Sequence, residues 1–88
     1  MALDSTRRRV LVAFRQPAVL VSFDAASGAV QERIEICGDA DDVFVDPRRG
    51  YIYVACGQGA IDVLVFLAVR ATGSEGAAVW QLRPLDRP

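Results

Sequence analysis

Residues 45–63 read VDPRRGYIYVACGQGAIDV, and a related pattern lies 42 positions earlier, in residues 3–21. At this offset seven of the nineteen aligned positions are identical, and three more exchange one apolar residue for another. Internal repeats with periods of about 20 to 50 residues are typical of repeat architectures. The sequence therefore predicts two copies of one structural unit. The identical pairs are Asp4/Asp46, Arg7/Arg49, Val12/Val54, Ala13/Ala55, Gln16/Gln58, Ala18/Ala60 and Val21/Val63, and the apolar exchanges are Leu3/Val45, Val10/Ile52 and Val19/Ile61.

The segments within each repeat have the composition of β-strands. β-Branched and aromatic residues dominate them, Gly, Pro and Asp separate them, and helical periodicity is absent. The turns agree, because residues 24–28 and 46–50 each begin with an Asp that can hydrogen-bond its own backbone and end with a Gly suited to positive φ. The predicted strands are residues 10–14, 19–23, 30–36, 43–45, 51–56, 61 to about 69, and 78–82.

A period of about 40 to 45 residues with four antiparallel strands is the spacing of a β-propeller blade. Residues 37–63 also resemble repeats of the YVTN propeller proteins, the YncE-like family. In those repeats an inner strand ends in Asp-Pro, here Asp46-Pro47, and leads to an aromatic-rich second strand and a Gly-containing loop. Residues 24–28 match the turn that follows the third strand. The resemblance covers roughly residues 3–65 and implies an all-β fold of antiparallel four-stranded β-propeller blades, of the kind that WD repeats also form.

Two features depart from complete blades. The chain begins inside the first strand of a blade, and the repeat pattern is lost after about Phe66. Residues 73–76 can still turn the chain so that a fourth strand pairs. A truncated or frame-shifted reading frame explains both departures as well as a dedicated two-blade protein does. The predicted organisation is a single partial propeller domain over residues 1–88, with repeat one at about 3–38, repeat two at about 39–82 and a loose tail at 83–88.

The composition limits the classes of partner and chemistry. The chain has 88 residues, 52% of them hydrophobic, and a net charge of −1. These values argue against intrinsic disorder and give no reason to expect nucleic acid or an anionic membrane surface as a partner. All ten basic residues are Arg, and there is no His. The chain therefore lacks the commonest general base and the most frequent zinc ligand.

No convincing export signal or membrane anchor is predicted. The basic start at residues 5–12 resembles a twin-arginine signal, but Arg15-Gln16-Pro17 interrupts the apolar run that follows it. The apolar run at 63–69 is far shorter than the roughly 20 residues of a membrane-spanning helix. The compartment stays open, although proteins of the resembled family are often extracytoplasmic.

The two cysteines are predicted to lie near each other. In a propeller blade the loops after the second and fourth strands share one face. Cys37 follows the fourth strand of repeat one, and Cys56 ends the second strand of repeat two, so both belong to the same rim. Two alternatives stay open: a disulfide, which an oxidising compartment would favour, or two free thiols.

The only acidic cluster consists of Asp39, Asp41 and Asp42, in the loop that enters the innermost strand of repeat two. One hypothesis is a Ca²⁺ site near a propeller's central opening, since Ca²⁺ takes several oxygen ligands. The alternative is that Asp39 and Asp41 order the turn through backbone hydrogen bonds while Asp42 caps the strand. The turn is favoured, because the spacing does not fit the calcium-loop template.

Three further motifs have a functional and a structural interpretation. Gly57-Gln58-Gly59 lacks the third Gly and the following helix of a nucleotide-binding loop, so a hairpin turn is favoured. Arg7-Arg8-Arg9 could contact phosphates, but its place before a strand favours a solvated edge that discourages strand addition. Tyr51, Tyr53 and Trp80 could stack on a ligand, and packing between neighbouring blades is the favoured role.

The sequence assembles no recognisable reaction centre. It favours a non-catalytic repeat module or propeller fragment that binds or scaffolds through the loops at 37–42 and 56–60. One alternative is part of a lactonase-like propeller hydrolase, with the Asp39–Asp42 loop lining the channel and Ca²⁺ as its cofactor. Another is a truncated gene product with no independent function. The sequence names no ligand.

Two blades leave apolar faces without neighbours, and about three repeats are usually required for stability. The sequence therefore predicts a homo-oligomer or association with further propeller blades. Two chains would supply about four blades and three chains about six, which lies within the range of closed rings.

Overall fold

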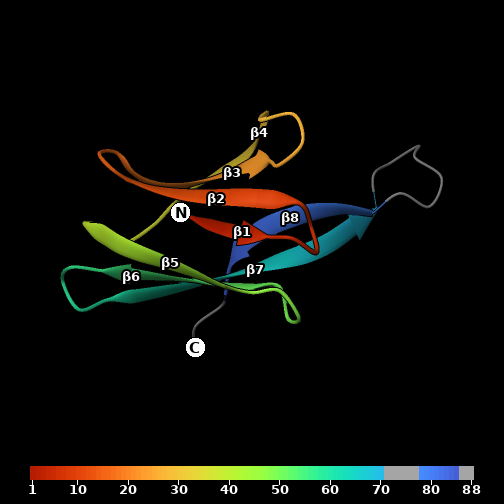
Figure 1. The fold of residues 1–88 in the computed structure, drawn as a ribbon. Coiled ribbons are helices and arrows are strands. Elements are labelled where there is room, and N and C mark those ends of the chain that lie inside the picture. Colours follow the sequence, from red (N-terminus) through yellow and green to blue (C-terminus); the bar gives the residue numbers. More distant parts are fainter. Residues whose placement is uncertain (71–77, 86–88) are drawn as a thin grey trace.

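The structure is a computed structural model that describes residues 1–70 and 78–85. It contains two four-stranded antiparallel sheets (Figure 1), with strand orders β1-β2-β3-β4 and β5-β6-β7-β8. Neighbouring strands in each sheet are therefore consecutive in the chain, as expected for strands joined by short hairpins. The strands are β1 (Ala2–Asp4), β2 (Arg9–Arg15), β3 (Ala18–Asp24), β4 (Val30–Glu35), β5 (Ala40–Asp46), β6 (Tyr51–Cys56), β7 (Ile61–Arg70) and β8 (Ala78–Pro84).

The predicted all-β, antiparallel architecture is confirmed, and each predicted strand is present. The bounds of β6 agree with the prediction, whereas β5 begins three residues earlier than expected, at Ala40. The short strand β1 pairs with β2 at the start of the first sheet. Arg83 and Pro84 belong to β8, so the predicted loose tail is wrong for these two residues. The predicted turn at 73–76 and the last three residues lie outside the described part of the chain.

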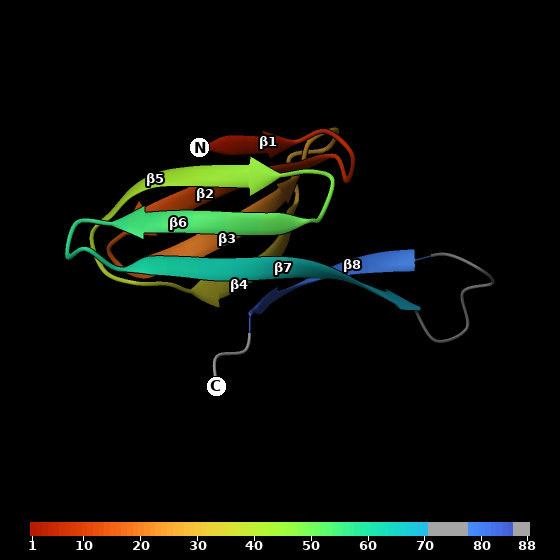
Figure 2. The same cartoon turned by 90° about the horizontal axis from the view of Figure 1, so that it is seen from below.

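The two sheets lie face to face and share one core (Figure 2). Strand β5 contacts β1 and β2, and the outermost strands β4 and β8 also contact each other. Like strands of the two repeats are thus stacked on like strands. The most buried apolar side chains come from both sheets, which ties the repeats into one unit through the burial of apolar surface. They are Leu11 and Leu20 of the first sheet and Ile52, Val54 and Leu64 of the second, each 0–2% exposed.

The 42-residue offset holds for the first two strands of each repeat and becomes 41 in the third. Val12 pairs with Val21 in the first sheet, whereas Val54 pairs with Asp62 in the second. The connection between these strands is therefore one residue shorter in repeat two. Because successive strand residues point to opposite faces, a shift of one residue exchanges the faces. The predicted match of Val21 with Val63 is wrong, and Asp62 occupies the equivalent place.

The turns are built as their residues predict. Gly28 and Gly50 have φ values of 76° and 71°, and each amide donates to the carbonyl of the Asp four residues earlier, at 2.8 Å. In the turn between β1 and β2, Arg8 takes the place equivalent to Gly50 and has a φ of 57°. A non-glycine residue in this left-handed region costs about 1–2 kcal/mol.

Replacing Arg8 by glycine should therefore stabilise the protein. The expected gain in the free energy of unfolding is about 0.5–1 kcal/mol, because relief of the strain outweighs the greater freedom of glycine in the unfolded chain. The opposite exchange, Gly50→Ala, should destabilise it, since the φ is 71° and a Cβ atom would lie 2.7 Å from Nη2 of Arg7. Urea unfolding followed by circular dichroism measures both changes. A loss of stability in Arg8→Gly would contradict this account.

The prediction of a solvated arginine edge is wrong for Arg7. Its side chain is 8% exposed, and Nη1 lies 3.0 Å from Oδ2 of the fully buried Asp4. The same nitrogen donates to the carbonyl of Pro47 across the sheet interface, at 3.0 Å. Its guanidinium lies over the Trp80 ring, 4.3 Å from the centroid, which adds a cation–π contact. Only Arg8 of the three arginines is exposed.

Arg9 is also buried, and it belongs to a polar group that joins the two sheets. Its Nη1 donates to Oγ of Ser22 at 3.0 Å and lies 3.8 Å from Oε1 of Glu32. The Glu32 carboxylate accepts the amide of Leu82 in the second sheet, at 2.7 and 2.9 Å. Burial raises the pKa of Glu32, while the Leu82 amide and the Arg9 charge oppose that rise. The interface between the repeats is therefore partly polar.

The three aromatic candidates lie in two places, Trp80 at the core and the two tyrosines on an outer face. Trp80 packs against the shared core, as expected for a residue between neighbouring repeats. Tyr51 and Tyr53 alternate with the buried residues of β6 and therefore lie on the outer face of the second sheet. Their rings meet edge to face, with centroids 6.4 Å apart.

Candidate functional site

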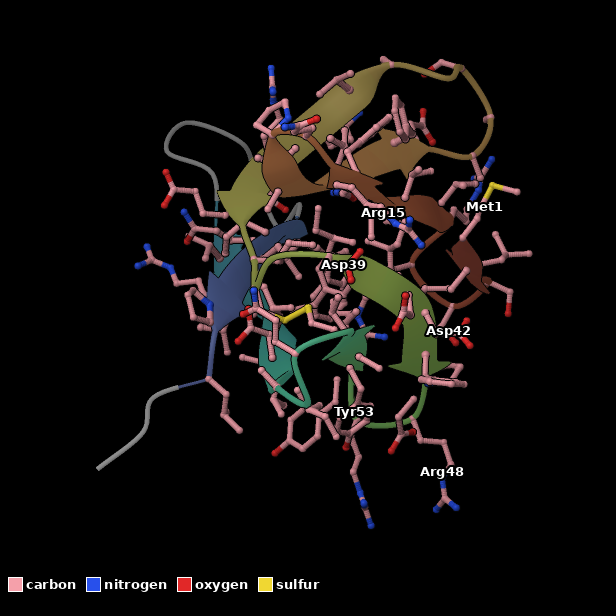
Figure 3. The ribbon with its side chains drawn as sticks, turned by 90° about the vertical axis from the view of Figure 1, so that its left-hand side faces the viewer. Met1, Arg15, Asp39, Asp42, Arg48 and Tyr53 are labelled. Carbon is pink, nitrogen blue, oxygen red and sulfur yellow. A yellow bond between two sulfur atoms is a disulfide. The ribbon has the colours of Figure 1, made fainter. Side chains whose placement is uncertain are left out.

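The candidate site lies at one end of the two sheets, where loops from both repeats meet. We call this end the disulfide rim: the turn at residues 15–18, the segment 36–41 that crosses between the sheets, and the loop 56–60. Figure 3 views the molecule from this end, with Arg15 and Asp39 near its centre. Strand direction explains the gathering, because β2 and β6 both end here and β5 begins here.

A disulfide joins two of these segments. The sulfur atoms of Cys37 and Cys56 are 1.97 Å apart, so of the two alternatives left open by the sequence the structure contains the bridge. The Cys37 amide also donates to Oδ2 of Asp62, at 2.6 Å. The segment that leaves the first sheet is thus held to the second sheet by a covalent bond and a charge-assisted hydrogen bond.

A tight backbone contact holds Asp39 against the 56–60 loop. The Gly57 amide donates to the carbonyl of Asp39 at 2.7 Å, and a Cβ atom on residue 57 would collide with the Asp39 carboxylate. Gly59 has a φ of 81°, and its amide donates to the carbonyl of Cys56 at 3.1 Å. Gly57-Gln58-Gly59 therefore forms a hairpin turn, as the favoured interpretation predicts, and both glycines have a steric reason.

Arg15 is the side chain of repeat one that contacts the rim residues of repeat two. Its Nε donates to the carbonyl of Ala40 at 3.2 Å and lies 3.7 Å from Oδ1 of Asp39. Its Nη2 lies 3.4 Å from Oδ1 of Asp41. These side chains are 56–65% exposed, so each ion pair contributes under about 1 kcal/mol. Sequence reasoning missed Arg15, because the equivalent place in repeat two is Gly57 and nothing local indicates its acidic partners.

The three carboxylates of the predicted acidic cluster do not converge. Asp39 and Asp41 face Arg15, whereas Asp42 follows a register shift in β5 and stands opposite Ala55 on the outer face of the second sheet. In Figure 3 Asp42 lies apart from Asp39. Within residues 1–70 and 78–85 no three acidic or thiol side chains could hold a metal ion. Strand alternation places Asp42 on another face, and Arg15 pairs with Asp39 and Asp41, so this geometry gives no support to the hypothesis that Asp39, Asp41 and Asp42 hold Ca²⁺.

The rim therefore presents polar groups of both charge signs on a braced backbone. A guanidinium and two carboxylates lie together at its surface, and the exposed Gln58 belongs to one of its loops. These groups can donate and accept hydrogen bonds toward a polar ligand. On the described residues no helix is long and apolar enough to cross a membrane. Comparison with protein-family models, curated proteins and solved structures finds no match to this chain.

Proposed function

We propose that this chain is a β-propeller-type repeat module of the YVTN kind, which binds a polar partner through the disulfide rim without catalysing a reaction. Three observations support the propeller type: a 42-residue repeat, four antiparallel strands in each repeat, and face-to-face stacking of the two sheets. Propeller blades combine these three properties. In this proposal the two sheets are consecutive blades.

The cross-linked loops of the disulfide rim are the observation that supports the binding role. Its loops come from both repeats, and they are joined by the Cys37–Cys56 bridge and by the contact between Asp39 and Gly57. Loops fixed in this way lose little conformational entropy when a ligand binds. At the opposite end a hydrogen bond from Arg7 to the carbonyl of Pro47 joins the two repeats. The rim has a covalent bridge between them in addition to its hydrogen bonds. The rim is thus the better prearranged surface.

Screening on peptide and glycan arrays tests this role. The rim variant Asp41→Ala/Gln58→Ala removes two exposed polar groups, and Arg48→Ala/Arg49→Ala does the same at the opposite end. We expect ligands that bind the wild-type chain to lose at least about tenfold in affinity toward the rim variant, since each lost hydrogen bond to a charged group is worth about 1.5–3 kcal/mol. The control variant should keep them. Absence of any ligand, or equal loss in both variants, would refute the binding role.

A further inference from the structure

Each sheet has a second, apolar face that no described strand covers. Large apolar side chains are exposed on the second face of both sheets, including Phe14 at 43% and Phe44 at 55% exposed. We name these surfaces the β2–β3 face and the β6–β7 face. The β2–β3 face consists of Val10, Val12, Phe14, Val19, Val21 and Phe23. The β6–β7 face consists of Phe44, Tyr51, Tyr53, Val63, Val65 and Leu67.

The repeat shows that these two faces are counterparts. Leu11 is 0% exposed in the core between the sheets, whereas Tyr53, 42 residues later, lies on the uncovered β6–β7 face. The reverse holds for Val54, which is 0% exposed in the core, while its equivalent Val12 lies on the uncovered β2–β3 face. The two sheets therefore meet through opposite faces of the repeat. They are stacked head to tail, and no two-fold axis relates them.

Head-to-tail stacking leaves one copy of each of the two contact surfaces uncovered. The β6–β7 face of the second sheet is equivalent to the side of the first sheet that packs against the second sheet. The β2–β3 face of the first sheet is equivalent to the side of the second sheet that packs against the first sheet. A contact between unlike faces is heterologous, and it closes into a ring if the rotation per unit allows.

We propose that the β2–β3 face of one copy of this chain docks onto the β6–β7 face of a second copy, continuing the internal stacking into a closed ring of two or three copies. This inference deepens the propeller part of the proposed function, and it is independent of any ligand at the rim. Burial of both apolar faces drives the association.

The shapes of the two faces suit this arrangement. The β2–β3 face contains a hollow of about 290 Å³, lined by apolar side chains of β2, β3 and β4, Pro17 and Arg33. The β6–β7 face carries the bulky edge-to-face pair of Tyr51 and Tyr53, beside Phe44. Aromatic side chains that fill a pocket on the partner are typical centres of a protein interface.

A charged substitution on each face tests the proposal through the mass of the assembly in solution. Phe14→Arg places a charge only on the β2–β3 face, and Phe44→Arg places one only on the β6–β7 face. Both side chains are solvent-exposed, so the fold should tolerate the substitutions. At micromolar concentration, light scattering should give the wild type two or three times the monomer mass and each variant the monomer mass. An equimolar mixture of the two variants should give a dimer, because one intact β6–β7 face then meets one intact β2–β3 face.

The control is Ala26→Arg, in an exposed turn outside both faces, which should assemble like the wild type. Thermal unfolding verifies that each variant is folded. A monomeric wild type, a polydisperse aggregate, or a variant mixture that stays monomeric would overturn the proposal. A dimer joined through two like faces would give a different result, because one of the two variants would then keep the wild-type mass, and that result would also overturn the proposal. The rim variant Asp41→Ala/Gln58→Ala should keep the ring, so ring formation and ligand binding can fail separately.

Discussion

Replacing Asp4 by alanine is expected to lower the free energy of unfolding by about 3–5 kcal/mol, because it leaves the Arg7 charge buried without its partner. The Asp4 side chain is fully buried and lies 3.0 Å from Nη1 of Arg7. Among the described residues, none accepts a hydrogen bond from the buried Nε of Arg7, so this guanidinium has few other polar partners. The remaining acceptor, the carbonyl of Pro47, carries no net charge to balance it. Urea unfolding followed by circular dichroism measures the change.

The second repeat supplies a matched control for this substitution. Asp46 is the equivalent of Asp4, and it also orders a turn by accepting backbone amides. Its partner Arg49, however, is 73% exposed and 3.8 Å away. Asp46→Ala should therefore cost about 1 kcal/mol, mostly for the lost turn hydrogen bonds. Equal losses in the two variants would show that the buried ion pair contributes nothing beyond the turn.

Removing the disulfide should cost about 3 kcal/mol, since it closes a loop with a sequence separation of 19 residues and restricts the unfolded chain. Reduction or the double substitution Cys37→Ala/Cys56→Ala should lower the urea midpoint. The reductant should have no effect on the double variant, which serves as the control. Thiol titration of the denatured protein should find no free thiol before reduction and two after it. Two thiols in the oxidised protein would contradict the bridge.

Much of the fold could be predicted from local chemistry. Alternating β-branched residues and the Asp-to-Gly turns at 24–28 and 46–50 are short-range signals, and the strands form where they predict. The sequence alignment of the two repeats is off by one residue in the third strand of repeat two. The preceding connection is one residue shorter there, so Val63 matches Val21 in sequence but not in register. Strand pairing, and not sequence similarity between the repeats, determines that register.

The candidate site was predictable where topology alone brings residues together. Strand order places Cys37 and Cys56 at one rim, and they form a bridge there. The acidic cluster was misleading, because three nearby carboxylates in sequence can point in different directions when a strand starts among them. The role of Arg15 depends on Asp39 and Asp41 in the other repeat, and no spacing rule indicates that contact.

Local sequence thus accounts for the strands and the turns in this protein, because each depends on neighbours a few residues apart, and the repeat is visible in the sequence as identical residues 42 positions apart. Tertiary structure determined the burial of the two equivalent arginines. Arg7 contacts Pro47 and Trp80 and is buried, whereas Arg49 is exposed at the surface. Tertiary structure also decided which face of each sheet is covered, since Val12 and Val54 are the same residue at the same place in the repeat. Only the neighbour stacked against each sheet distinguishes them, and that neighbour belongs to the other repeat.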